Sequence, residues 1–288
     1  MLRRLLPPSM ADLESNEMEE LSPEQKKDIA KWFLTHAPPG EIQYIAKDIR
    51  SILSDEDVYN AAASVAFPSY NKSHMISLDF PNKLGDVIIT TFGEVSENEY
   101  LEPRSCQVAT VDHVKQTCTS VRPATDEELP SPYIEEFRAA LDAEISKYVS
   151  DTYPKGVCSV YCVKGKDAEG AGANFELAVV ISAARHSPQN FCNGSWRSIW
   201  NVEFRDDLQL IELRGKMQVD AHYFEEGNVQ LDAKHECKNS TIFQASYSNL
   251  PDTTFKDLRR KLPVTRTLFP WQSALMNRDI AKEIGNGK

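Results

Sequence analysis

The stretch that decides the fold is IELRGKMQVDAHY, residues 211–223, in which apolar and polar side chains alternate almost without a break. The apolar residues that point one way are Ile211, Leu213, Met217, Val219, Ala221 and Tyr223. Charged and polar residues occupy the positions between them, and this period of two is typical of a strand with one buried face. At about 3.4 Å per residue, the stretch predicts one strand of roughly 40 Å.

The segments around this strand predict its neighbours in a sheet. Similar alternation recurs around Phe175–Ile181 and Trp196–Phe204, and Glu226-Gly227-Asn228 predicts a hairpin turn into a strand at Val229–Leu231. Gly165–Gly172 does not match a phosphate-binding loop and is interpreted as a flexible hairpin. Short turns between successive strands favour a five-stranded antiparallel meander sheet with one apolar face.

The apolar face of such a sheet needs a cover. A long helix starts at Ser131-Pro132, presents Ile134, Phe137, Leu141, Ile145 and Tyr148 on one side, and stops at Tyr153-Pro154-Lys155-Gly156. A second long helix is expected after the last strand. Only Ser240–Leu250 is available for this helix, and that segment is too short to cross the sheet. Part of the apolar face therefore has no predicted helix to cover it.

The front of the chain predicts a helical bundle. Ser22-Pro23-Glu24-Gln25 is a capping box with proline at the first helical position, and Ile29, Trp32 and Phe33 follow at helical spacing. Residues 36–40, HAPPG, break that helix before a second one at Ile42–Leu53. Ser54 is expected to cap a third helix that ends at Phe67-Pro68.

Together these patterns predict an α+β fold. We divide the chain into a flexible extension (1–20), a helical bundle (21–68), a small β region (69–130), a helix with the antiparallel sheet (131–250) and a C-terminal amphipathic arm (251–288). The small β region is expected from three short alternating segments between residues 74 and 121.

Composition bounds the class of protein. The chain has 288 residues, 41% of them hydrophobic and 26% charged, as in an ordinary soluble globular protein. It has no apolar run of about 18 residues, and its N-terminal apolar stretch is too short for a signal peptide. Met10 is a second plausible start, so residues 1–9 are expected outside the fold. The six cysteines form no dense framework and are expected to be reduced thiols in the cytoplasm.

No catalytic constellation stands out. Cys158 and Cys162 share a strand face but lack a second ligand pair for zinc, and nothing completes a metal set with His235-Glu236-Cys237. Cys192-Asn193-Gly194-Ser195 lacks a recognisable base for a nucleophile and is interpreted as a hairpin turn before the Trp196 strand. We therefore expect no enzyme activity, no cofactor and no metal.

The C-terminal segment FKDLRRKLPVTRTLFPW, residues 255–271, is basic although the whole chain has a net charge of -11. Phe255, Leu258 and Leu262 form one apolar stripe, and Pro263 ends the short helix that carries it. Composition alone favours a terminal helix that packs on its own body with a solvated basic edge. The alternative is an amphipathic arm laid into a groove on an acidic partner.

The same segment carries a resemblance to a known family. DTTFK (252–256) with LRR (258–260), LPVTRT (262–267) and Trp271 resembles the C-terminal signature of the F-actin capping protein alpha subunit. Further blocks that resemble the family, notably its plant members, are His36–Glu41, Tyr153–Gly156, Phe191–Ser198 and His222–Val229. The resemblance runs from about Leu21 to the end of the chain.

This resemblance implies a binding function without catalysis. A capping protein beta subunit of similar fold would pair with residues 131–250, the dimerisation core, and join the two sheets into one. The heterodimer would then block the barbed end of the actin filament by steric occlusion, independently of calcium. The resemblance also implies inhibition by acidic phosphoinositides, and neither nucleic acid nor a membrane span is expected.

The actin-binding residues follow from the match to the family's arm. Lys256, Arg260 and Arg266 match its actin-contacting basic positions, and Arg259 and Lys261 are plausible helpers. Leu258, Leu262 and Trp271 are our choice of apolar anchors. The implied location is the cytoplasmic actin cytoskeleton.

One departure from the family lies between Gln244 and Asp252. Members of the family have a long helix there, and about thirty residues of it are missing from this chain. We expect an under-covered sheet, which would weaken folding and pairing with the beta subunit. Two alternatives therefore remain open, a phosphoinositide-binding module that uses the same basic arm, and a non-functional splice product.

Overall fold

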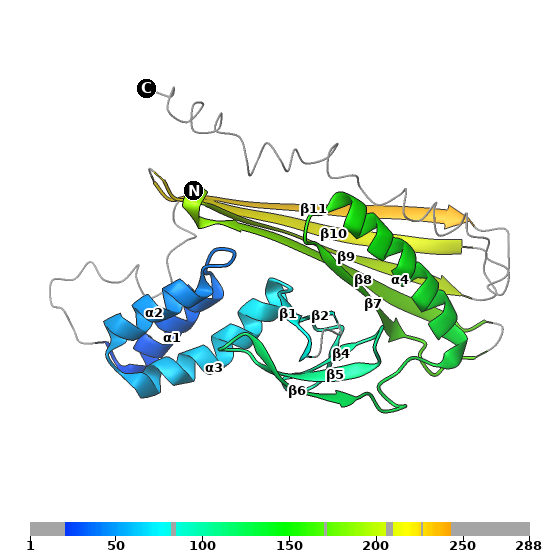
Figure 1. Cartoon of the computed structure of the whole chain (residues 1–288), viewed down its shortest axis with the longest axis horizontal. Coiled ribbons are helices and arrows are strands. Elements are labelled where there is room, and N and C mark those ends of the chain that lie inside the picture. The colour runs from blue at the N-terminus through cyan, green and yellow to red at the C-terminus, as the bar shows by residue number, and fades with distance from the viewer. Residues whose placement is uncertain (1–20, 82–84, 170–171, 206–209, 226, 243–288) are drawn as a thin grey trace, which may run out of the picture.

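The computed structural model describes residues 21–81, 85–169, 172–205, 210–225 and 227–242. Within these residues a five-stranded sheet forms the middle layer (Figure 1). One long helix covers one face of the sheet, while a helical bundle and a small β region lie against the other. The molecule therefore has three layers, and the sheet contacts every other part of the fold.

The sheet confirms the predicted meander. Its strands are β7 (Val157–Lys164), β8 (Asn174–Ser187), β9 (Cys192–Arg205), β10 (Leu210–Tyr223) and β11 (Val229–Ile242). They are ordered β11-β10-β9-β8-β7, with each neighbouring pair antiparallel. The strand predicted at residues 211–223 is β10, because its alternation leaves only one register that buries the apolar side chains.

The apolar face of the sheet packs against α4 (Pro132–Thr152), the helix expected to cover it. Ile134, Phe137, Leu141 and Ile145 of α4 are buried in one core with Trp196 and Trp200 of β9 and the apolar row of β10, Ile211, Leu213, Met217 and Val219. The polar row of β10 lies on the opposite face, because successive side chains of a strand alternate between faces.

The helical bundle comprises α1 (Pro23–Thr35), α2 (Ile42–Leu53) and α3 (Glu56–Ser73). The capping box at Ser22 is confirmed, since its side chain accepts from the Gln25 backbone and the Gln25 side chain accepts from the Ser22 backbone. The buried face of α1 is centred on Ala30 and Leu34. Of the residues singled out from the sequence, Ile29 and Trp32 are half-buried at its margin and Phe33 is exposed.

Two expectations for the third helix are wrong. Asp55 caps α3 by accepting from the backbone of Asp57 and Val58, whereas Ser54 ends α2 with a left-handed φ of 50°. The helix also continues through Pro68 to Ser73. Tyr70 and Asn71, beyond the proline, are buried and hydrogen-bonded across the fold, which offsets the roughly 3 kcal/mol that an interior proline costs.

The small β region contains a two-stranded and a four-stranded sheet. The first pairs β1 (Ser77–Asp79) with β2 (Asp86–Ile88), and the second is ordered β3 (Glu94–Ser96), β4 (Glu99–Glu102), β5 (Gln107–Asp112) and β6 (Thr117–Pro123). Arg104, after β4, donates to Asp142 of α4 at 2.5 Å and to the Cys158 carbonyl of β7 at 2.7 Å. This arginine fixes the small β region to the helix and the sheet.

Two further predictions fail around the long strands. Cys192–Ser195 is not a turn but the start of β9, and the turn that precedes it is the 3-10 helix η4 (Pro188–Asn190) with Phe191 at a left-handed φ of 53°. The short helix expected from Ser240 does not begin there, because Ser240–Ile242 still pair with β10. The rest of that predicted helix, residues 243–250, lies outside the described residues.

Candidate functional site

The predicted actin-binding residues all lie outside the part of the chain that the structure describes. They are Lys256, Arg259, Arg260, Lys261, Arg266, Leu258, Leu262 and Trp271. Two other regions of the described chain have the character of functional surfaces. One is the free edge of the sheet, and the other is the junction between the helical bundle and the sheet.

The free edge is β11, which pairs only with β10 among the described strands. Alternate residues along its length therefore point backbone N–H and C=O groups away from the sheet. Such an edge is a template for pairing with another chain. A strand of 14 residues offers an unusually long template, because strands are mostly about five or six residues long.

The edge also carries exposed apolar side chains. Val229 and Leu231 are 44% and 43% exposed, and their β10 partners are Tyr223 and Ala221. They therefore continue the apolar row of the sheet beyond the part that is buried. No described element covers this part of the apolar row, and an exposed apolar row at a sheet edge is suited to an interface with another protein.

The charged face of the same edge is paired locally. Lys234 lies 3.1 Å from Asp232, and Lys216 of β10 lies 3.4 Å from Glu236. All four side chains are more than half exposed, so these ion pairs add little to stability and can exchange partners. The edge thus combines an apolar face with a polar face of mixed charge.

The junction between bundle and sheet is centred on Glu41, at the start of α2. Its Oε1 accepts from Asn193 of β9 at 2.8 Å and from His222 Nδ1 of β10 at 2.7 Å. The other ring nitrogen of His222 lies 3.1 Å from the side-chain oxygen of Asn228. Because a carboxylate can only accept, the Nδ1–H of His222 is the donor in the contact with Glu41.

The turn before Glu41 also brings the bundle close to the sheet. Gly40 has φ +74°, and a Cβ there would lie 2.5 Å from the His186 ring of β8. Its N–H donates to the Tyr70 hydroxyl, which in turn donates to the Pro38 carbonyl. The turn thus holds α3 and approaches β8 closely, and both its φ and this contact favour glycine.

A buried ion pair adds a further attachment. Arg197 of β9 pairs with Asp220 of β10 and also donates to the Ser73 carbonyl at the end of α3. Only 4% of Arg197 is exposed. Burial raises the pKa of Asp220, and the guanidinium beside it acts in the opposite direction. Removing either partner would leave a buried charge without compensation.

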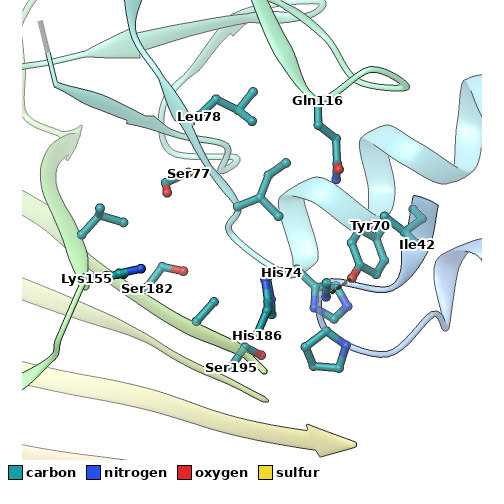
Figure 2. Close-up of a pocket in the computed structure, with 15 residues that line it drawn as sticks. Ile42, Tyr70, His74, Ser77, Leu78, Gln116, Lys155, Ser182, His186 and Ser195 are labelled. Atoms are coloured by element: carbon teal, nitrogen blue, oxygen red, sulfur yellow. Dashed lines mark hydrogen bonds between the residues drawn. The ribbon is translucent and has the colours of Figure 1, made fainter. Parts of the chain in front are cut away.

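These attachments surround a cavity of about 450 Å³, which we call the junction cavity (Figure 2). Figure 2 shows Tyr70 of α3, His74 directly after that helix, Lys155 of the turn after α4, and Ser182 and His186 of β8 around it. Burial and the charge of Arg197 lower the pKa of His74 to about 3, and burial also lowers the pKa of His186. Both imidazoles are therefore neutral at physiological pH.

The sequence patterns alone did not indicate this junction as a site. The blocks that carry the family resemblance contain Gly40, Glu41, Lys155, Asn193, Arg197, His222 and Asn228, and the structure brings them together. The four blocks themselves were the available signal. They are far apart in sequence, and only the fold shows that they meet. His186, His74 and Ser182 lie outside the blocks and carried no signal of their own.

The remaining candidate metal and nucleophile positions form no such cluster. Cys158 Sγ lies 3.3 Å from Arg104, burial raises its pKa, and Cys162 donates to the Lys164 carbonyl. Among the described residues no group of three or more His, Cys, Asp and Glu side chains is placed to hold a metal ion. No helix in the described ranges is long and apolar enough to cross a membrane.

The fold and its free edge define a class first: an α+β protein whose helix-covered meander sheet ends in an open strand suited to assembly. The comparisons then give the family. The model of the F-actin capping protein alpha subunit matches residues 30–246 and 241–283. This chain belongs to that family.

Two curated relatives agree. The chain is 59% identical to the F-actin-capping protein subunit alpha of Arabidopsis thaliana, over 97% of this chain and 100% of the relative. It is 38% identical to the subunit of the same name from Dictyostelium discoideum, over 89% of this chain and 96% of the relative. The homodimeric actin capping protein alpha subunit of Plasmodium berghei shares the fold, with a TM-score of 0.63, 21% identity and coverage of 91% and 92%.

The comparisons also locate the internal departure from the family. The Arabidopsis alignment extends over 308 positions, whereas 97% of this chain is about 279 residues, so about 29 positions have no counterpart here. The two stretches matched by the family model meet at residues 241–246. The shortening therefore falls directly after β11, in agreement with the position inferred from the sequence.

Proposed function

We propose that this chain is the alpha subunit of a heterodimer that caps the barbed end of actin filaments. Membership of the family over nearly the whole chain carries this proposal. The capping protein beta subunit would occupy the β11 edge, where backbone hydrogen bonds and the apolar pair Val229 and Leu231 are available to it. The complex would act in the cytoplasm, on the actin cytoskeleton.

The mechanism that we propose is steric occlusion without chemistry. Lys256, Arg260 and Arg266 of the arm would steer the complex to the acidic end of the filament, with Arg259 and Lys261 as helpers. Leu258, Leu262 and Trp271 would supply the apolar contacts that slow dissociation. A subunit bound in this way blocks both gain and loss of actin, because its body covers the surface on which the next actin would sit.

Pairing with the beta subunit is the first test, because the shortening after β11 removes material that would cover the sheet. The chain should be co-expressed with a plant capping protein beta subunit and examined by size exclusion. A soluble 1:1 complex supports the proposal and contradicts our expectation that the shortening weakens pairing with the beta subunit. Separate elution of a soluble alpha chain would contradict the assignment of the edge.

Capping by that complex is the second test, with elongation of pyrene-labelled actin from filament seeds as the readout. Reversal of Lys256, Arg260 and Arg266 to glutamate should weaken capping by at least about tenfold while the melting temperature stays near that of the wild type. A matched control reverses Lys31, Lys47 and Lys147, which are exposed on α1, α2 and α4. Equal capping by the two triple variants would contradict the role of the arm.

The same variants also test the second candidate function, which is binding of acidic phosphoinositides by the arm. The basic composition of residues 252–288 is the observation that favours it. Co-sedimentation with phosphoinositide-containing liposomes, lost on reversal of the arm charges, would support it. Liposome binding without any capping would make this the primary activity and replace the capping proposal.

A further inference from the structure

The free edge of the sheet carries charges in an order that can match a second copy of itself. The alternate positions of β11 that lie opposite the polar row of β10 include, in order, Asp232, Lys234, Glu236 and Lys238. The sign of the charge therefore alternates along the strand, at a spacing of about 7 Å. Two identical strands of this kind can run antiparallel so that each acid lies opposite a base, which favours their pairing.

Two like-charge pairs occur at the same edge. Asp232 lies opposite Asp220 of β10, and Lys238 lies opposite Arg214. Like charges directly opposite each other destabilise a pair of strands. Burial raises the pKa of Asp220, and the charge of Asp232 acts in the same direction. A base brought beside Asp232 and an acid brought beside position 238 would relieve both pairs.

One register of two β11 strands pairs all four charges with opposite charges. Opposite residues of an antiparallel pair lie on the same face, so a symmetric pair with one continuous apolar face has its two-fold axis at a residue position. With the axis at His235, Lys234 lies opposite Glu236 of the second copy, and Asp232 lies opposite Lys238. The present ion pairs of Lys234 and Glu236 are more than half exposed, so both side chains can take partners from a second copy.

The neighbouring registers bring like charges together. With the axis at Lys234, this lysine lies opposite itself and Asp232 lies opposite Glu236. With the axis at Glu236, this glutamate lies opposite itself and Lys234 lies opposite Lys238. An axis one position further out on either side leaves two of the four charges opposite uncharged residues. The order of the charges thus selects a single register.

The selected register also uses nearly the whole edge. It pairs residues 229–241 of each copy, which is 13 of the 14 residues of β11. The exposed side chains of Val229 and Leu231 would lie beside the strand of the second copy on the apolar face. We propose that, without a beta subunit, two copies of this chain pair through β11 in this register and form a symmetric dimer. The dimer covers an open strand edge that would otherwise be prone to aggregation.

This inference uses the open β11 edge and does not depend on actin capping. The beta subunit is assigned to the same edge, so the symmetric dimer and the heterodimer exclude each other. Size exclusion with multi-angle light scattering of the full chain, expressed alone, should give one species of twice the chain mass of 32.5 kDa. A monomer, or only polydisperse larger material, would overturn the proposal. A monomer that still forms a 1:1 complex with a beta subunit would leave the proposed function intact.

Lys234→Glu and Glu236→Lys test the register. Each variant alone replaces two attractive contacts per dimer by two repulsive ones, so each should raise the dimer dissociation constant at low salt by about tenfold or more. In an equimolar mixture of the two variants, each changed residue lies opposite an unlike charge, and dimers should form again with near wild-type affinity. Lys31→Glu, at an exposed position of α1, is the control and should leave the dissociation constant unchanged. A mixture that stays monomeric, or equal weakening by the control, would refute the register.

A cysteine at the axis gives an independent test. His235→Cys places the two copies of one exposed position opposite each other, with Cβ atoms about 4.5–5.5 Å apart, so a short bismaleimide should cross-link them above the wild-type background. Gln230→Cys is exposed on the same strand, but it lies five residues from the axis, so its two copies are about 34 Å apart and should not be linked. Equal cross-linking of the two variants, or none at position 235, would contradict the proposed dimer.

Discussion

Glu41 and His222 are 181 positions apart in the sequence and are joined by a contact of 2.7 Å between Oε1 and Nδ1. This contact connects the first turn of α2 to the polar face of β10. Asn193 donates to the same carboxylate oxygen, so one side chain of the bundle accepts hydrogen bonds from two strands of the sheet, β9 and β10. The attachment of bundle to sheet therefore depends on few residues.

Replacement of Glu41 should show this dependence directly. Glu41→Ala leaves the buried side chains of Asn193 and His222 without their acceptor, and such unsatisfied groups cost about 1–3 kcal/mol. The free energy of unfolding should fall by that amount in urea titrations of the alpha–beta complex. Glu56→Ala, which removes an exposed pair with Arg50, is the control and should leave the midpoint near the wild-type value. Equal midpoints for the two variants would contradict the junction as described.

Gly40 should be intolerant of a side chain for two separable reasons. Gly40→Ala brings a Cβ to within 2.5 Å of the His186 ring and also forces alanine to φ +74°, a conformation that costs on the order of 1–3 kcal/mol. His186→Ala removes the collision but not the backbone cost. The double variant should therefore be more stable than the sum of the single losses predicts, by about 0.5 kcal/mol or more. Strictly additive losses would show that the ring moves aside freely.

The two edges of the sheet should differ in their role in assembly. Leu231 on β11 and Val163 near the end of β7 are similarly exposed, at 43% and 44%, and each lies on an edge strand. Leu231→Asp places a charge in the surface that we assign to the beta subunit, and it should reduce recovery of the complex in co-purification. Val163→Asp, the matched control, should not. The reverse pattern would move the interface to β7.

His74 should make stability depend on pH. Its folded pKa of about 3 lies below the ordinary value of 6.5, so between these two values the unfolded chain binds a proton that the folded chain does not. The free energy of unfolding should therefore fall as pH drops from about 6.5 toward 3. His74→Phe keeps a ring to stack on Tyr70 and should flatten that slope between pH 7 and pH 4.5. His36→Phe, at an exposed ring, should retain the wild-type slope, and identical slopes in both variants would exclude His74 as the cause.

The meander sheet was predictable because its signal is local. β10 follows from an alternation that continues from Ile211 to Tyr223, and any shift by one residue would expose the whole apolar row. The start of β9 was not predictable in the same way. Asn193-Gly194 is typical of a turn, but here Asn193 is buried against Glu41 from the bundle, and that tertiary contact outweighs the local preference.

Pro68 illustrates the same limit for helices. A proline ends most helices, yet α3 continues because Tyr70 and Asn71 beyond it bond to Pro38 and His113. Those partners lie 32 and 42 positions away, outside any local window. The junction cavity was invisible for this reason, since its lining comes from seven separate stretches of chain. The arm residues, by contrast, were chosen from one continuous segment, and their role stays a prediction.

The end of β11 at Ile242 limits how far from the sheet the arm can start. Eight residues, 243–250, separate that strand end from the start of the arm at Pro251. Fully extended, a chain of that length spans at most about 30 Å. Every charge near the start of the arm is thereby confined to a small volume around one corner of the sheet, where a short tether gives an effective concentration in the millimolar range. A partner surface that lies beyond this radius would be out of reach for the first residues of the arm.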